Sequence, residues 1–209
     1  MAKLDLKKQY KHLYLPSAKK VTLVEVPAFQ FVMVDGKMDP DETPENSTAF
    51  HQAMQALYGM AYTLKFNSKL REENPIDFTV MALEGLWWVE SGPFDPQHRE
   101  PWFWTMMIMQ PDHVDRDMVE SALAQVREKQ DNPAVDRVRF ERFEEGPAIQ
   151  IMHVGPYADE SRSLAKMEAF AVEMGYTYRG KHHEIYIGDP RRAKPENLKT
   201  VLRQPVAIG

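Results

Sequence analysis

An internal repeat places the strongest constraint on the fold of this chain. The segment PAFQFVMVDG at 27–36 is echoed by PAIQIMHVG at 147–155, and each copy leads into a loop and a helical pattern. TMMIMQP at 105–111 is matched in the same relative place by TVLRQPV at 200–206. Self-similarity on this scale indicates that one supersecondary unit occurs twice.

Each copy has the pattern of a strand–helix–strand–strand unit. The first copy predicts a helix that begins near Ser47 and ends near Phe66, and the second predicts one over 160–174. We therefore predict an α+β fold, in which an N-terminal arm over 1–20 precedes a single domain over 21–209. Within that domain, repeat one covers 21–111, a linker helix covers 112–131 and repeat two covers 137–209.

The numbers of helices and strands predict a ligand groove. A three-stranded sheet with a single helix can cover only one of its faces. If the two units are related by a pseudo-two-fold axis, their uncovered faces would surround a shared groove. We expect a ligand to bind there.

The strand within HHEIYIGDPRR at 182–192 carries an unusual set of polar side chains. Side chains alternate between the two faces of a strand, so His182, Glu184 and Tyr186 share one face. The other face, with His183 and Ile185, is expected to pack against helices. Glu184 then either faces a cavity or lies on a solvated face, where Arg191 or Arg192 would pair with it.

Two further strands are rich in tryptophan and methionine. LEGLWWVE at 83–90 and the strand at 102–110 supply at least one indole each to the groove, whichever face is inward. Aromatic walls with a buried carboxylate suit a planar ligand that has a positive or electrophilic centre. The alternative is that these rings are plain core. The candidate ligand-binding residues are Trp87, Trp88, Trp102, Trp104, Met106, Glu84, Tyr157 and His182.

Charge and composition exclude several classes of protein. The net charge of -5 argues against a general nucleic-acid binder. The chain has no cysteine, which excludes disulfides and thiolate metal sites. The N-terminal residues lack the apolar core of a secretory signal, and no apolar run is long enough to span a membrane. We expect a cytoplasmic protein with neither a nucleic-acid nor a membrane partner, whose oligomeric state the sequence leaves open.

A metal or covalent mechanism has little support. His182 and Glu184, with His153 or His98, could ligate zinc, but their spacing matches no recognised site. Nucleophilic catalysis lacks both a cysteine and a G-x-S-x-G motif. We therefore expect neither a metal nor a cofactor.

The chain resembles the GyrI-like small-molecule-binding proteins along nearly its whole length. The resemblance lies in VPAFQFVMVDG (26–36), LEGLWWVE (83–90), the segment over 131–157 and HHEIYIGDPRRAKPENLKTVLRQPV (182–206). It implies a duplicated module with a ligand between the copies, and a groove glutamate at the position of Glu184. No helix-turn-helix flanks the module, so the chain resembles the standalone members. Some of those have been assigned a hydrolase activity that opens the cyclopropane of planar DNA-alkylating natural products.

Two functions follow from this resemblance. In the first, the protein is a cofactor-independent hydrolase: Glu184 is the general base on a water, and Tyr186 orients that water or hydrogen-bonds the substrate carbonyl. The indoles would hold the flat alkylating unit. In the alternative, the protein sequesters cationic or amphipathic aromatic drugs without changing them.

Overall fold

The computed structural model describes the whole chain except residues 1–2, 91, 93–100 and 189–192. The strands are β1 (Thr22–Val26), β2 (Phe29–Met38), β3 (Leu83–Trp88), β4 (Trp102–Gln110), β5 (Arg139–Phe143), β6 (Gly146–Val154), β7 (Tyr176–Tyr178), β8 (His182–Tyr186) and β9 (Lys199–Ile208). The α-helices are α1 (Leu6–Gln9), α2 (Lys11–Tyr14), α3 (Thr48–Leu70), α4 (Arg116–Lys129) and α5 (Ser161–Met174). Short 3-10 turns cover Val135–Arg137, Tyr157–Asp159 and Pro195–Asn197.

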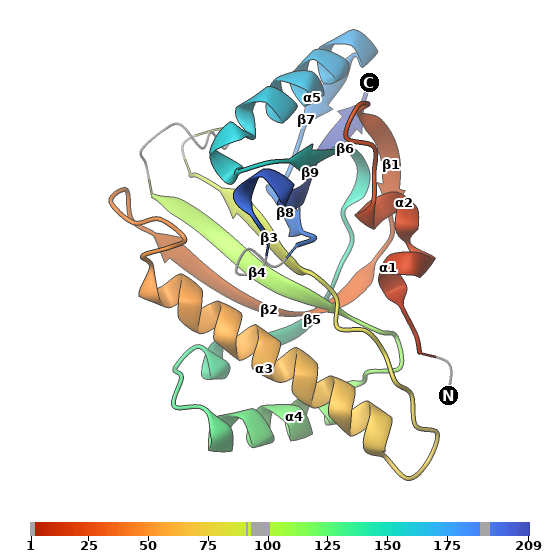
Figure 1. Ribbon diagram of the computed structural model, residues 1–209, viewed down its shortest axis with the longest axis vertical. Coiled ribbons are helices and arrows are strands. Elements are labelled where there is room, and N and C mark those ends of the chain that lie inside the picture. Colours follow the sequence, from red (N-terminus) through yellow and green to blue (C-terminus); the bar gives the residue numbers. More distant parts are fainter. Residues whose placement is uncertain (1–2, 91, 93–100, 189–192) are drawn as a thin grey trace.

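One antiparallel sheet runs through the molecule (Figure 1). Its strand order is β1-β6-β9-β8-β3-β4-β2-β5, and β7 pairs with β9. The early strand β1 pairs with β6 in the C-terminal half, while β5 pairs with β2 in the N-terminal half. The predicted α+β class is confirmed. The duplication into two related units, and the boundaries drawn from it, stay predictions.

The long helices α3 and α5 lie on the same face of the sheet. Phe50 of α3 stacks on Trp87, which is opposite His182 in the β3–β8 register. Met167 of α5 packs in a cluster with Leu202, which is opposite Glu184. Because opposed residues of an antiparallel pair point to one face, the helices cover the face of Glu184. Figure 1 shows β8 and β3 between α5 and α3.

This arrangement corrects the expectation about the two faces. The helices were expected on the His183 face, with the Glu184 face uncovered. Alternation along a strand separates two sets of side chains but does not say which set a distant helix covers. The choice is made by the apolar contacts of α3 and α5 with the Glu184 face.

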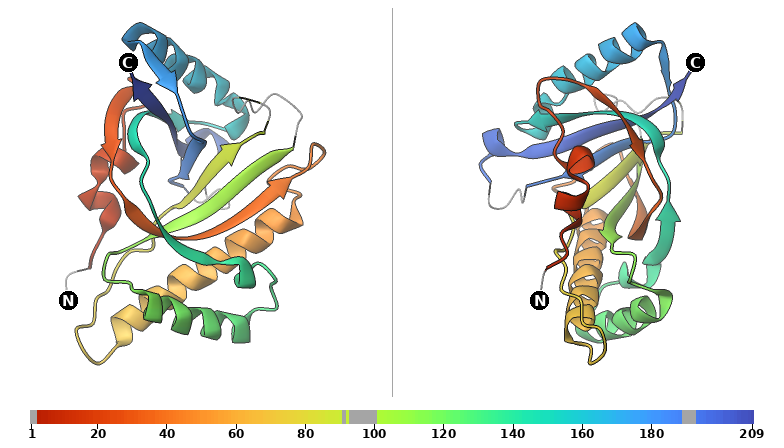
Figure 2. Two further views of the ribbon diagram at one scale, coloured as in Figure 1. Left: turned by 180° about the vertical axis from the view of Figure 1, so that it is seen from behind. Right: turned by 90° about the vertical axis from the view of Figure 1, so that its right-hand side faces the viewer.

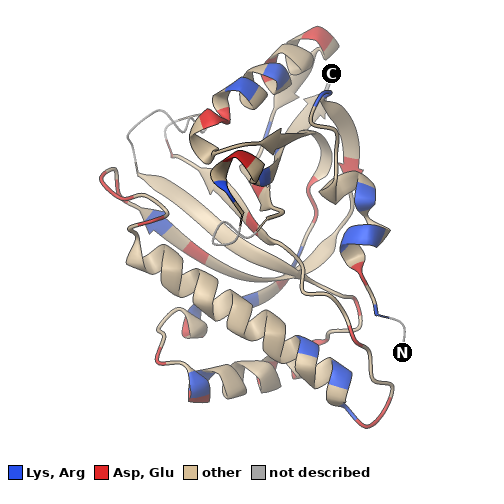
Figure 3. Cartoon of the chain, in the orientation of Figure 1, with Lys and Arg blue, Asp and Glu red and all other residues tan. Residues whose placement is uncertain are grey.

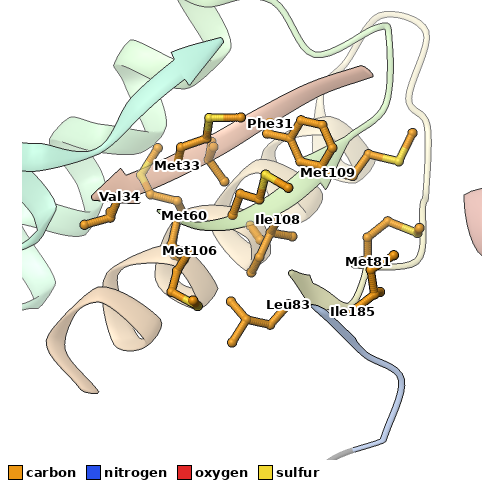
Figure 4. Packing of buried hydrophobic residues seen from close by; sticks show 14 of the residues in the cluster. Phe31, Met33, Val34, Met60, Met81, Leu83, Met106, Ile108, Met109 and Ile185 are labelled. Atoms are coloured by element: carbon orange, nitrogen blue, oxygen red, sulfur yellow. The ribbon is translucent and has the colours of Figure 1, made fainter. Parts of the chain in front are cut away.

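The core on the two faces of β2 and β4 is rich in methionine (Figure 4). Flexible thioethers fill irregular gaps in this core. Trp104 is completely buried, and its indole occupies the space that a side chain at Gly36 would need. Apart from Lys65 and Lys69 near its end, α3 carries no charged residue, as the mainly tan ribbon in Figure 3 shows. The linker helix α4 packs against α3.

The N-terminal arm docks beside β1 (Figures 1 and 2). The ring of Tyr10 lies edge-on to that of Phe29, with centroids 4.7 Å apart. The Tyr14 hydroxyl donates a 2.7 Å hydrogen bond to Glu84 Oε1. Arg203 Nη2 donates to the Leu13 carbonyl at 2.8 Å. The arm is therefore fixed to the sheet through buried polar contacts.

A buried cluster of four charged side chains lies where the arm docks. His183 donates from Nε2 to Glu84 Oε2 at 3.1 Å and from Nδ1 to the Glu145 carboxylate at 3.1 Å. Arg203 Nη1 donates to Glu145 Oε2 at 3.1 Å. Two cations thus neutralise two anions, which makes their burial tolerable. Glu84 bridges the arm and β8.

Burial and pairing shift the pKa values in this cluster. Burial opposes the charged imidazole, but the charges and hydrogen bonds of Glu145 and Glu84 outweigh it and raise the pKa of His183 to about 9. Burial likewise opposes ionisation of Glu145, but His183 and Arg203 lower the pKa of Glu145 to about 2. Burial and the nearby Glu84 raise the pKa of Tyr14 well above its ordinary value.

Replacing His183 by glutamine should destabilise the fold strongly. The variant leaves two buried carboxylates with Arg203 as the remaining cation, and breaking a buried pair costs about 3–5 kcal/mol. Urea unfolding at neutral pH measures this loss. His51→Gln, at an exposed position on α3, is the control and should change the free energy of unfolding by no more than about 0.5 kcal/mol. A similarly small loss for His183→Gln would contradict the ionic cluster.

The cluster should also give stability a defined pH window. The contribution of Glu145 is complete above its ordinary pKa of 4.5 and is lost as pH falls through about 2. The contribution of His183 is complete below its ordinary pKa of 6.5 and is lost as pH rises through about 9. The stability difference between wild type and His183→Gln should therefore be largest between these ordinary values. A difference that stays constant to alkaline pH would refute the assignment of charge to His183.

Candidate functional site

Glu184 lies in a short chain of hydrogen bonds on the helix-covered face. The Tyr186 hydroxyl donates to Glu184 Oε2 at 2.8 Å, and the Trp87 indole N–H donates to the Tyr186 oxygen at 3.1 Å. His182 Nε2 is 3.4 Å from the other carboxylate oxygen, Oε1. The Glu184 side chain is 14% exposed. The carboxylate is thus held in a fixed direction and still reaches solvent.

A missing side chain at Gly85 makes this geometry possible. Gly85 is directly opposite Glu184 in the β3–β8 register. A Cβ there would lie 2.9 Å from Trp87 Nε1 and 3.2 Å from the Tyr186 hydroxyl. These contacts are too close for an unstrained side chain. Glycine therefore lets the indole and the phenol meet above the strand.

A second carboxyl group, Glu160, belongs to the same site. Glu160 directly precedes α5 and is 7% exposed, and its Oε1 has no hydrogen-bond partner among the described residues. Burial, together with the charge of Glu184, raises the pKa of Glu160 to about 9. The neutral form of Glu160 is thus favoured, near a Glu184 carboxylate that the Tyr186 phenol holds in place.

Tyrosines from both sides surround the two acids. The ring of Tyr157 lies edge-on to that of Tyr186, with centroids 6.0 Å apart. Burial, and then the charges of Glu184 and Glu160, raise the pKa of Tyr157 to about 12. Tyr58 of α3 also interacts electrostatically with Tyr157. Tyr58 and Tyr157 are each 37% exposed, so they form the solvent side of the site.

Four of the predicted wall residues lie on this face, and all of them except Trp102 are buried. The Trp87 and Trp102 rings are nearly perpendicular, with centroids 6.1 Å apart. Phe50 contacts both Trp87 and Trp104. Trp104 and Met106 are completely buried. Trp104 is opposite Trp87 and Met106 is opposite Gly85 in the β3–β4 register, and Trp87 is the indole bonded to Tyr186.

Two predicted site residues are on the other face. Glu84 is opposite Ile185 in the β3–β8 pair and belongs to the buried ionic cluster. Trp88 follows Trp87 along the strand and therefore points away from Glu184. Alternation along β3 puts Glu84 and Trp88 on the same face of the strand. The structure separates both of them from Glu184, Tyr186, Tyr157 and His182, which it brings together.

Two other roles are considered for Glu184: ligation of zinc together with His182 and His153 or His98, and a salt bridge with Arg191 or Arg192. Within the described ranges, no cluster of three or more histidine and acidic side chains is arranged to hold a metal ion. His153 bonds to the Ser163 hydroxyl at 3.0 Å and to the Pro156 carbonyl at 3.1 Å. His98, Arg191 and Arg192 lie outside the described residues.

In the described part of the chain, no helix has the length and hydrophobicity of a membrane span.

Sequence reasoning missed Glu160 and Tyr58. Glu160 begins a predicted helix, where an acidic residue is ordinary, so its burial had no local signal. Tyr58 and Tyr62 are spaced four residues apart on α3, and their ring centroids lie 6.5 Å apart. This spacing was the available signal for an exposed aromatic stripe.

Comparison with known proteins identifies the fold. The chain is 42% identical to an uncharacterized conserved protein from Listeria innocua, with a TM-score of 0.87 over 98% of this chain and 100% of that one. A hydrolase from Listeria innocua is 39% identical, with a TM-score of 0.83 over 98% and 100% of the two chains. A further Listeria innocua hydrolase is 40% identical, with a TM-score of 0.85 over 99% and 100%.

The family comparison covers nearly all of the sequence. No curated protein matches the chain. The family described as the GyrI-like small molecule binding domain matches residues 19–207, a range that contains every residue of the site described above. The protein therefore belongs to the GyrI-like small-molecule-binding family.

Proposed function

We propose that this protein is a hydrolase that adds water to a planar, electrophilic aromatic compound. The proposed substrate is a cyclopropane-bearing alkylator whose strained ring is joined to a dienone, and ring opening would detoxify it in the cytoplasm. The observation that carries this proposal is the pair of unlike carboxyl groups, Glu184 and Glu160, on one face of the sheet. The two similar Listeria innocua hydrolases add support for the reaction class.

In the proposed reaction, Glu184 accepts a proton from a water molecule. The water oxygen forms a bond to the cyclopropane methylene, and the adjacent ring C–C bond breaks. The released electron pair moves through the conjugated ring to the carbonyl oxygen, which takes the proton of Glu160 and becomes a phenol. The proton on Glu184 then returns to Glu160 through solvent, so the sum is substrate plus one water.

The other residues have defined parts in this scheme. Tyr186 keeps its proton because burial and Glu184 raise its pKa well above the ordinary value, so it is a donor and not a base. Its hydrogen bond fixes the Glu184 carboxylate toward the attacking water. Tyr157 and Tyr58 would stack on the flat substrate from the solvent side. No metal is needed, because one positioned base contributes roughly 10²–10⁴-fold.

Replacing Glu184 by glutamine tests the base. We expect turnover to fall by roughly 10²–10⁴-fold while the affinity for a neutral alkylator is nearly unchanged. Mass spectrometry of the alkylator after incubation measures the gain of one water. Glu173→Gln, at an exposed position on α5, removes the same charge and should retain full turnover.

The same experiment distinguishes the non-catalytic alternative. A protein that only sequesters cationic drugs would use the charge of Glu184 for binding. In that case saturated wild type would return the alkylator intact, and Glu184→Gln would instead weaken the binding of a cationic aromatic dye.

Replacing Glu160 by glutamine tests the acid. In wild type, kcat/KM should fall as pH rises through about 9, where Glu160 ionises. The variant should be slower and should lack this alkaline limb. A kcat/KM that shows the same alkaline limb in both proteins would refute the role of Glu160.

The stability of the Glu160→Gln variant provides an independent measurement. The raised pKa of Glu160 means that its favourable contribution is complete below the ordinary value of 4.5 and is progressively lost up to about pH 9. At pH 7 the glutamine variant should therefore be more stable to urea than wild type. A purely structural glutamate would give a loss of stability.

A further inference from the structure

A shallow hollow that is open to solvent lies on the face of the sheet opposite Glu184. It has a volume of about 580 Å³ and is formed mainly by β2, β3, β4 and β5. Its lining includes Asp35, Trp88, Phe103, Arg137, Arg139 and Lys181. Trp88 is opposite Phe103, and Asp35 is opposite Thr105, so these side chains point to one face. The proposed reaction uses none of them.

The floor of this hollow is aromatic. The rings of Trp88 and Phe103 stack with centroids 5.8 Å apart and planes inclined by 22°. The Lys181 ammonium lies 3.2 Å from the centroid of the Trp88 ring. Both rings are only partly buried, so they offer flat apolar surface next to a cation.

The charge in this hollow has the opposite sign to that of the whole chain. Four lining residues are basic and one is acidic, whereas the chain has a net charge of -5. Asp35 is already engaged: Arg139 lies 2.8 Å away, and the Thr105 hydroxyl donates to it at 2.6 Å. When Asp39 and Glu141, the ion-pair partners of Lys37 and Arg139, are counted with Asp35, the four basic residues exceed the three acids by one charge.

Lys181 and Arg137 are the two basic lining residues that no described carboxylate pairs with: Lys181 lies over the Trp88 ring, and Arg137 Nη1 donates to the Asp35 carbonyl at 3.3 Å. Arg139 also pairs with Glu141 at 3.1 Å, and Lys37 pairs with Asp39 at 3.3 Å. Across the described part of the chain, no carboxylate forms an ion pair with Lys181 or Arg137. Burial lowers the pKa of Lys181 from its ordinary value, and a bound anion would raise that pKa again.

We propose that this hollow binds a planar aromatic anion, such as an aromatic carboxylate. The ligand ring would replace the Lys181 ammonium on the face of Trp88 and extend over Phe103, and the carboxylate would accept hydrogen bonds from Lys181 and Arg137. Charge-assisted hydrogen bonds of this kind favour an anion over its neutral isostere. The site is chemically distinct from the acidic Glu184 site, and the proposal does not depend on the proposed hydrolysis.

Calorimetric titration with 1-naphthoate tests this proposal. We expect 1-naphthoate to bind at least about tenfold more tightly than neutral 1-naphthamide, since a hydrogen bond to a charged group contributes about 1.5–3 kcal/mol. Lys181→Gln should weaken 1-naphthoate binding by about the same factor. Lys166→Gln, at an exposed position on α5, removes an equal charge elsewhere and should have little effect.

Two further variants locate the bound anion. Binding should quench tryptophan fluorescence, and Trp88→Phe should remove most of this quenching. Glu184→Gln should leave 1-naphthoate affinity unchanged, because that site is on the other face. Equal affinities for 1-naphthoate and 1-naphthamide, no effect of Lys181→Gln, or a changed affinity in Glu184→Gln would each overturn the proposal.

Discussion

The antiparallel pairing of β3 with β8 joins the two halves of the sheet and sets the chemistry of both faces. On one face it brings Gly85 opposite Glu184 and Trp87 opposite His182. On the other face the same two strands place Glu84 next to His183. A slip of one residue in this register would exchange the two sets of side chains. The site and the buried ionic cluster therefore depend on a single strand pairing.

The acidic residues on the two faces of the sheet have different electrostatic environments. Glu84 and Glu145 are buried with His183 and Arg203, so their charges are compensated and they fix the N-terminal arm. Glu160 is buried beside another carboxyl group, and its raised pKa is a cost to folding at neutral pH. Strongly shifted pKa values, and the loss of stability that accompanies them, are concentrated at functional sites in proteins. This contrast distinguishes a structural cluster from a candidate site.

Sequence patterns predicted the helices α3, α4 and α5 and the strand that carries Glu184. Alternation along β8 correctly grouped His182, Glu184 and Tyr186. Alternation alone could not tell which face the helices cover, because that depends on packing between segments far apart in the chain. The contacts of Glu145 and Arg203 with His183 depend on strand register, and the burial of Glu160 depends on how α5 packs on the sheet. Local patterns carry neither kind of information.

The central claim is that Glu160 keeps its proton at neutral pH beside Glu184. A carbon-13 NMR titration of the side-chain carboxyl groups measures this directly, and the Glu160→Gln variant assigns the resonance by its disappearance. We predict that this resonance has the chemical shift of a protonated carboxyl at pH 7 and titrates near pH 9. A Glu160 resonance that titrates near the ordinary value of 4.5 would contradict the claim.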